Sequence, residues 1–82
     1  MKTKNSLYSI SVCGRKFKTK FKVGDRVAAP CYVYPLIIAS IDEFATNLCG
    51  KLCWDTTDEG YLLGKVKTDN GDSYPESELY HI

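Results

Sequence analysis

One stretch of this sequence alternates strictly between two kinds of side chain, and this alternation constrains the fold more than any other feature. Residues 16–23 read Lys-Phe-Lys-Thr-Lys-Phe-Lys-Val. Successive side chains of a β-strand point to opposite faces, so the four lysines would line one face. The other face would carry Phe17, Thr19, Phe21 and Val23. Because a helix would scatter the lysines around its circumference, the segment predicts a strand with one buried face.

Further short strands follow, with turns between them. Cys13-Gly14 is expected as the turn that joins residues 7–12 to the strand just described, because glycine accepts a positive φ at little cost. Asn70-Gly71 is a second hairpin signal. Other strands are expected at residues 26–29, 36–41, 61–68, 73–74 and 79–82, with loops at 31–35 and 55–60 and a 3₁₀ turn at 75–79. Turns every eight to twelve residues or so predict a small barrel or sandwich.

Residues 42–55 allow two interpretations. Apolar side chains within this segment recur at the spacing of a helix face. Against a helix stand Thr46, Asn47 and Gly50, which are poor residues for a helix interior. We favour a turn around Ala45–Asn47 followed by a strand, with the helix as the alternative.

The length of the chain sets the number of domains. Eighty-two residues provide one domain, 1–82, which we divide into a hairpin extension (1–20) and a barrel (21–82). An apolar content of 44% is ordinary for a folded protein. The expected core consists of Phe17, Phe21, Val23, Val27, Ile37, Ile41, Leu52, Trp54, Leu63, Val66 and Leu79.

Several short motifs after residue 20 occur in an order known from one protein family. They are Phe21-Lys22-Val23-Gly24-Asp25-Arg26-Val27, Leu36-Ile37-Ile38 with Ile41, Cys53-Trp54-Asp55, and Tyr74-Pro75 with Leu79. This order resembles the YodC-like family of small uncharacterised bacterial proteins. The chain departs from the family pattern in that cysteine and tryptophan are adjacent and the Gly-Gly-Pro turn is reduced to Tyr34-Pro35. The resemblance implies a mostly β fold, a small SH3-like barrel of five to six antiparallel strands with the N-terminal hairpin added. It transfers no catalytic residue.

Basic residues are concentrated near the N-terminus. Residues 1–26 contain eight Lys or Arg and one acidic residue, whereas residues 27–82 contain three and nine. Lysines on one strand face stand about 7 Å apart, close to the phosphate spacing of a nucleic-acid strand. The candidate nucleic-acid-binding residues are Arg15, Lys16, Lys18, Lys20 and Lys22. The same clustering is also expected if the oppositely charged halves attract each other, or if the lysines protect a sheet edge.

Tyrosines supply a second candidate surface. Small barrels bind peptides through aromatic grooves, and the candidate protein-binding residues are Tyr32, Tyr34, Tyr61 and Tyr74. Our first hypothesis is therefore a non-catalytic module that binds a protein or peptide. Nucleic-acid binding through the lysine face is the alternative.

The sequence contains no recognisable catalytic or metal-binding pattern. Its one histidine, His81, is the penultimate residue, where a general base would be poorly held. Cys49 and Cys53 would lie about 13 Å apart on a strand, too far for one tetrahedral zinc ion; only a helix would bring them together. We therefore expect no enzyme activity, no cofactor, no bound metal and no membrane span. The four cysteines are expected as reduced, small buried side chains in a cytoplasmic protein.

Overall fold

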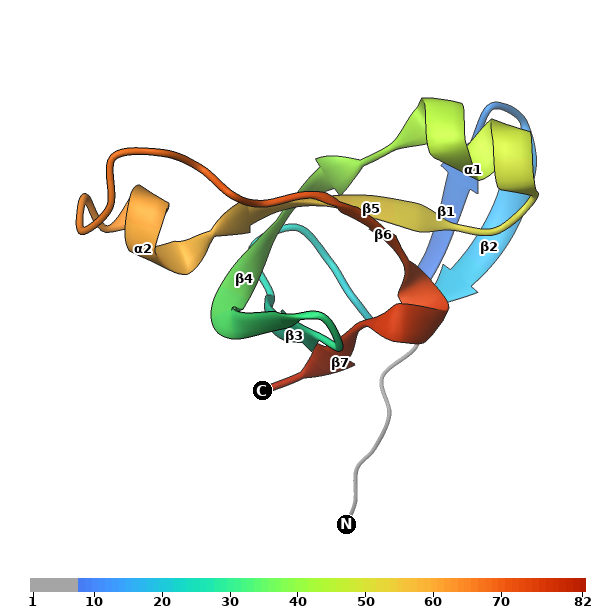
Figure 1. Ribbon diagram of the computed structural model, residues 1–82. Coiled ribbons are helices and arrows are strands. Elements are labelled where there is room, and N and C mark those ends of the chain that lie inside the picture. The colour runs from blue at the N-terminus through green and yellow to red at the C-terminus, as the bar shows by residue number, and fades with distance from the viewer. Residues whose placement is uncertain (1–7) are drawn as a thin grey trace, which may run out of the picture.

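The computed structural model describes residues 8–82, which form two antiparallel sheets and two short α-helices (Figure 1). In chain order the elements are β1 (Tyr8–Val12), β2 (Arg15–Thr19), β3 (Arg26–Ala29), β4 (Tyr32–Ile41), α1 (Glu43–Cys49), β5 (Cys53–Asp58), α2 (Glu59–Leu62), β6 (Ser73–Pro75), the 3₁₀ turn η1 (Glu76–Glu78) and β7 (Tyr80–His81). The mostly β fold class is confirmed.

The larger sheet has five strands in the order β6-β5-β4-β3-β7. Strands β3 to β6 pair with their neighbours in chain order, and all these pairs are antiparallel. The last strand, β7, returns to the free side of β3, where His81 pairs with Val27. The two outer strands of this sheet, β6 and β7, are therefore separated in the chain only by η1 and Leu79. The predicted 3₁₀ turn before a short last strand is confirmed.

The smaller sheet is the hairpin of β1 and β2, which forms as predicted but is shorter than expected. Cys13 and Gly14 have positive φ values of 51° and 81°, which suit the twist of strands joined by a two-residue turn. The alternation holds along β2 and ends at Thr19, whose Oγ1 accepts the backbone N–H of Phe21 at 3.0 Å. The chain then leaves the hairpin, so Val23 lies outside the predicted strand and is 61% exposed.

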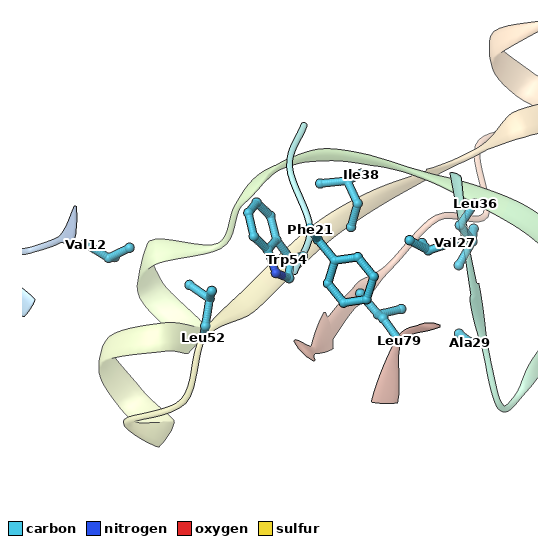
Figure 2. Packing of buried hydrophobic residues seen from close by; sticks show 9 residues of the cluster. All are labelled: Val12, Phe21, Val27, Ala29, Leu36, Ile38, Leu52, Trp54 and Leu79. Atoms are coloured by element: carbon cyan, nitrogen blue, oxygen red, sulfur yellow. The ribbon is translucent and has the colours of Figure 1, made fainter. Parts of the chain in front are cut away.

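The core lies within the curve of the five-stranded sheet, and Val12 of the hairpin joins it at one edge (Figure 2). Trp54 and Phe21 are its largest fully buried side chains. The other buried members come from both sheets and from the segments that join them: Val12, Val27, Ala29, Leu36, Ile38, Leu52 and Leu79. Of the predicted core, Phe21, Val27, Leu52, Trp54 and Leu79 are confirmed, and Phe17 and Ile41 pack against this cluster from its edge.

Four predicted core residues do not belong to the buried cluster. In β4, Leu36 and Ile38 point into the core, so the intervening Ile37 lies on the other face and is only partly buried. The run Leu36-Ile37-Ile38 is apolar throughout, and such a run does not reveal which face is buried. Val23, Leu63 and Val66 are exposed, because they lie in turns and bends on the surface of the protein.

The preferred interpretation of residues 42–55 is wrong for its first half, because residues 43–49 form the helix α1. The Asp42 side chain caps this helix by accepting the backbone N–H of Ala45 at 3.0 Å. Gly50 ends it in the left-handed conformation, with φ at 72°, and donates to the Thr46 carbonyl. Thus Gly50 terminates the helix instead of interrupting it. The strand expected after the turn is confirmed only from Cys53 onward, where β5 begins. Since β5 continues to Asp58, the loop expected at 55–60 is wrong for residues 55–58.

Two further predictions around β4 and β5 are wrong. Residues 32–35 belong to β4 and not to a loop, because β4 is one strand of ten residues. Residues 61–68 form no strand, because the Asp58 side chain accepts the backbone N–H of Gly60 and turns the chain into α2. Asn70-Gly71 consequently closes no hairpin with 61–68, and β6 pairs with β5 instead.

Candidate functional site

A pocket of about 420 Å³ lies at the end of the molecule that carries α2. Strand β4 supplies Tyr32, Tyr34 and Pro35 to one wall. The junction of β5 and α2 supplies the floor with Asp58, Glu59 and Gly60. The chain after α2 closes the remaining side with Leu63, Lys65, Val66 and Asn70. The lining is thus largely aromatic and apolar, with a few polar groups, as is common for ligand sites.

The pocket exists because β4 extends beyond its neighbour β5. The last pair between the two strands joins Leu36 to Asp58, and α2 begins at the next residue of the β5 side. On its other side β4 pairs with β3, and the register of this pair shifts between Val27 and Ala29 of β3. The start of β4 therefore bulges, and its side facing α2 is not covered by β5.

Asp58 is the central polar group of the pocket and is only 5% exposed. Its Oδ1 accepts the backbone N–H of Gly60 at 2.7 Å, and its Oδ2 accepts the hydroxyl of Tyr32. The bond from Tyr32 lowers the pKa of Asp58, and the same bond raises the pKa of the Tyr32 hydroxyl. Asp58 is therefore a buried carboxylate that stays ionised at neutral pH.

The neighbouring carboxylate, Glu59, is held in an ion pair. The Arg26 guanidinium donates from Nε to Oε2 at 2.7 Å and from Nη2 to Oε1 at 3.1 Å. These bonds lower the pKa of Glu59 and raise the pKa of Arg26. The pair ties the first residue of α2 to β3 and so fixes the floor of the pocket.

The segment that closes the pocket is fastened to β5 by several hydrogen bonds. Asp69 Oδ1 accepts the backbone N–H groups of Asp58 (2.9 Å) and Gly71 (2.8 Å). Thr56 bonds to the backbone of Asp72 through both its own N–H and its hydroxyl. At Gly71 a Cβ atom would collide with the Thr56 carbonyl, so only glycine allows this approach. The pocket wall is therefore preformed.

The structure brings together two of the four predicted tyrosines. The Tyr32 and Tyr34 rings line the pocket, with centroids 5.8 Å apart and planes at 70°. Tyr61 is exposed on α2 outside the lining, and Tyr74 packs against the core from β6. The sequence did not single out Asp58 for this site, although an aspartate followed by an acidic residue, here Glu59, is a helix-start signal that could have indicated its role as a cap.

The predicted basic residues do not form one strand face. Lys16 and Lys18 lie on the exposed face of β2, but Lys20 and Lys22 follow the end of the strand. Arg15 stacks over Phe17 at 5.3 Å, and the Lys20 and Lys22 amines lie over the Phe21 and Tyr8 rings at 5.4 and 5.8 Å. Tyr32 and Tyr34 belong to β4 of the five-stranded sheet, whereas Lys16 and Lys18 belong to β2 of the hairpin. The basic and aromatic candidates are thus separate.

The cysteines and the histidine lie outside the pocket. Only Cys53 is buried, so the prediction of buried cysteines is wrong for Cys13, Cys31 and Cys49. Burial raises the pKa of the Cys53 thiol. His81 is half-exposed, and its Nε2 lies 3.2 Å from Asp25 Oδ2. Within residues 8–82, no group of three or more His, Cys, Asp or Glu side chains is arranged to hold a metal ion. No helix in the same range has the length and apolar character needed to cross a membrane.

Comparison with known proteins adds no relative. No family model, no curated protein and no solved structure matches this chain. The function of the pocket therefore rests on its geometry alone.

Proposed function

We propose that this protein is a non-catalytic interaction module that binds an extended peptide segment of a partner protein. The observation that carries the proposal is the preformed pocket of about 420 Å³ between β4, α2 and residues 63–70. Concave, largely apolar sites with a few convergent polar groups are the usual form of a binding site. The volume suits one or two side chains of a peptide.

The surface around the pocket supports a peptide as the ligand. Two of the lining side chains, Tyr34 and Leu63, are themselves exposed, as is Leu62 next to Leu63 in the chain. Apolar and aromatic side chains are enriched in the centres of protein interfaces. An extended segment that follows the uncovered side of β4 would contact these residues together with the pocket.

Nucleic-acid binding through Arg15, Lys16, Lys18, Lys20 and Lys22 is the weaker proposal. Sequence-tolerant binding of single strands combines cations with aromatic rings on which bases stack. Here the rings of Tyr8, Phe17 and Phe21 lie beneath the cations themselves. The tyrosines that line the pocket belong to the other sheet.

We also propose that the five-stranded sheet is an SH3-like barrel, in keeping with the resemblance to the YodC-like family. The support is the return of β7 to β3 and the short link between the outer strands β6 and β7, which favours a curled sheet. The cytoplasmic location stays a prediction from the sequence.

Selection from a random decapeptide display library tests the proposed function. We expect the protein to enrich a common peptide pattern, and Tyr34→Ala to abolish the enrichment because it removes one wall of the pocket. Tyr80→Ala is the matched control, since Tyr80 is a similarly exposed tyrosine on β7 outside the pocket. Enrichment that survives Tyr34→Ala, or no enrichment at all, would contradict the proposal.

A further inference from the structure

We propose that the pocket selects a cationic side chain, lysine or arginine, of the bound segment, and that the Asp58 carboxylate is the charge this side chain meets. The inference rests on the proposed function and names the chemistry of its ligand. It is carried by the charge of Asp58, by the arrangement of the aromatic rings and by the apolar side chains of the lining.

The pocket floor contains a buried negative charge that no cation of residues 8–82 pairs. Within that range, the ion pairs join Arg26 to Glu59 and His81 to Asp25. Asp58 accepts hydrogen bonds from Tyr32 and Gly60, which are both uncharged. Buried charges in proteins are normally paired, because removal from water disfavours a lone charge. A cation supplied by a ligand would complete the pair.

The walls of the pocket suit a long cationic side chain. The Tyr32 and Tyr34 rings stand at 70° to each other, so they offer ring faces in two directions. A cation near an aromatic face is attracted by the electron density of the ring. Leu63 and Val66, on the opposite side, offer apolar contact to the methylene stem of a lysine or arginine.

Residue 60 is close to both the carboxylate and Val66. A Cβ atom there would lie 3.1 Å from Asp58 Oδ1 and 3.7 Å from Val66. Any larger residue at this position would therefore crowd Asp58.

Lys65 is the one cation that lines the pocket within residues 8–82, and its charge acts on Glu59. This charge repels a cationic ligand and so lowers the affinity of the pocket for it. A variant that removes the charge of Lys65 should therefore bind a cationic peptide more tightly.

Four pentapeptides test the proposal: acetyl-Gly-Gly-X-Gly-Gly-amide with X as lysine, arginine, norleucine or glutamate. Each is titrated into the ¹⁵N-labelled protein, and the backbone amide signals of Tyr34, Gly60 and Asn70 are followed. We expect the lysine and arginine peptides to shift these signals with at least about tenfold higher affinity than the norleucine peptide, which has the same stem without the charge. The glutamate peptide should bind least.

Asp58→Asn is the decisive variant, because asparagine removes the charge and keeps an oxygen for the Gly60 N–H. Its NH₂ group replaces the oxygen that accepts the Tyr32 hydroxyl, and that hydroxyl can accept from the NH₂ group instead. It should abolish the preference for lysine over norleucine. Asp55→Asn, a carboxylate on the same strand outside the pocket, is the matched control and should leave the preference unchanged. Lys65→Met should raise the affinity for both cationic peptides several-fold.

Each result has a distinct meaning. Equal binding of the norleucine peptide, or stronger binding of the glutamate peptide, would overturn the charge assignment and leave the pocket as a peptide site. A preference that persists in Asp58→Asn would overturn the role of Asp58. If no peptide shifts the pocket signals, the charge assignment is overturned as well, and the library selection alone decides whether the pocket binds peptides.

Discussion

The two helices lie at opposite ends of β5 and begin with the same local device, but only one of them leaves a pocket (Figure 1). Asp42 caps α1 by accepting the N–H of Ala45, and Asp58 caps α2 by accepting the N–H of Gly60. At the α1 end the space beneath is filled. At the α2 end none of residues 59–62 is buried, and the space beneath remains open.

The difference lies in what packs under each helix. Thr46 of α1 is fully buried, and its hydroxyl donates to the Asp42 carbonyl and accepts the backbone N–H of Cys53. Leu52 and Trp54 fill the core beside it (Figure 2). At the α2 end, the side chains of Asp58 and Tyr32 line a pocket instead. The same type of helix cap is therefore found beside a filled core at α1 and beside an open pocket at α2.

The largest effect is expected at the filled end. Trp54→Ala removes a side chain that is 2% exposed, together with the bond from its Nε1 to Glu76 at 3.2 Å. The free energy of unfolding should fall by about 3–5 kcal/mol, the cost of a large core cavity. Urea denaturation measures it. Val33→Ala, at an 88% exposed position, should change it by less than about 0.5 kcal/mol. Equal losses of unfolding free energy in the two variants would refute the distinction between the filled end at α1 and the open end at α2.

A smaller effect is expected from the wall of the pocket. Gly71→Ala places a Cβ atom against the Thr56 carbonyl and should detach residues 63–72 from β5, at a cost of about 1–3 kcal/mol. Gly64→Ala is the control in the same segment: its Cβ meets no atom within 4 Å, and only the φ of 74° opposes it, at about 1 kcal/mol. Peptide affinity should fall for Gly71→Ala and stay closer to the wild-type value for Gly64→Ala. The reverse order, measured by denaturation and by titration, would show that the wall is not held by this contact.

Two carboxylates of β5, Asp58 and Asp55, are expected to affect the pH dependence of stability in opposite directions. The bond from Tyr32 holds the pKa of Asp58 below its ordinary value of about 3.9. This carboxylate therefore contributes stability above that value, which is lost as the pH falls through the lower folded value. Burial raises the pKa of Asp55, so its ionisation opposes folding as the pH rises. The stability lost between pH 5 and pH 3 should thus be smaller in Asp58→Asn than in the wild type, and larger in Asp55→Asn. Urea denaturation at the two pH values checks this, and equal losses in all three proteins would contradict it.

The smallest effect is expected on the hairpin. Lys16→Glu with Lys18→Glu changes two exposed side chains of β2 that face away from the core. Stability should change by less than about 0.5 kcal/mol, and binding at the pocket should not change. A loss of pentapeptide binding in this variant, measured by the same titration, would show that the hairpin and the pocket are not separate surfaces.

Local patterns predicted the hairpin and much of the core correctly. The alternation in residues 16–19 and the turn at Cys13-Gly14 are both present in the structure, because strand periodicity and positive φ are properties of a few adjacent residues. The same kind of reasoning was wrong at residues 61–68. There the apolar residues suggested a strand, but the cap at Asp58 begins a helix and Leu63 stays exposed.

Two of the ten residues that line the pocket were among those predicted from the sequence to bind a protein. These two, Tyr32 and Tyr34, are aromatic side chains at alternate positions of a short segment, which is a local feature, and their role in binding stays a prediction. Tyr61 and Tyr74 belong elsewhere, and Asp58 was not recognised. The hydroxyl that Asp58 accepts comes from a residue 26 positions earlier in the chain, and no local pattern predicts such a contact.

The sequence by itself determined the strand content, the first hairpin and the placement of the largest aromatic side chains in the core. These follow from side-chain periodicity and from burial of apolar surface, which act over a few neighbouring residues. Only the tertiary structure decided that β4 extends beyond β5 and that Asp58 accepts the hydroxyl of Tyr32. It also decided that the lysines of β2 and the tyrosines of the pocket belong to different sheets. These features depend on which strands pair and in what register, and pairing between distant segments is decided by the packing of the whole chain.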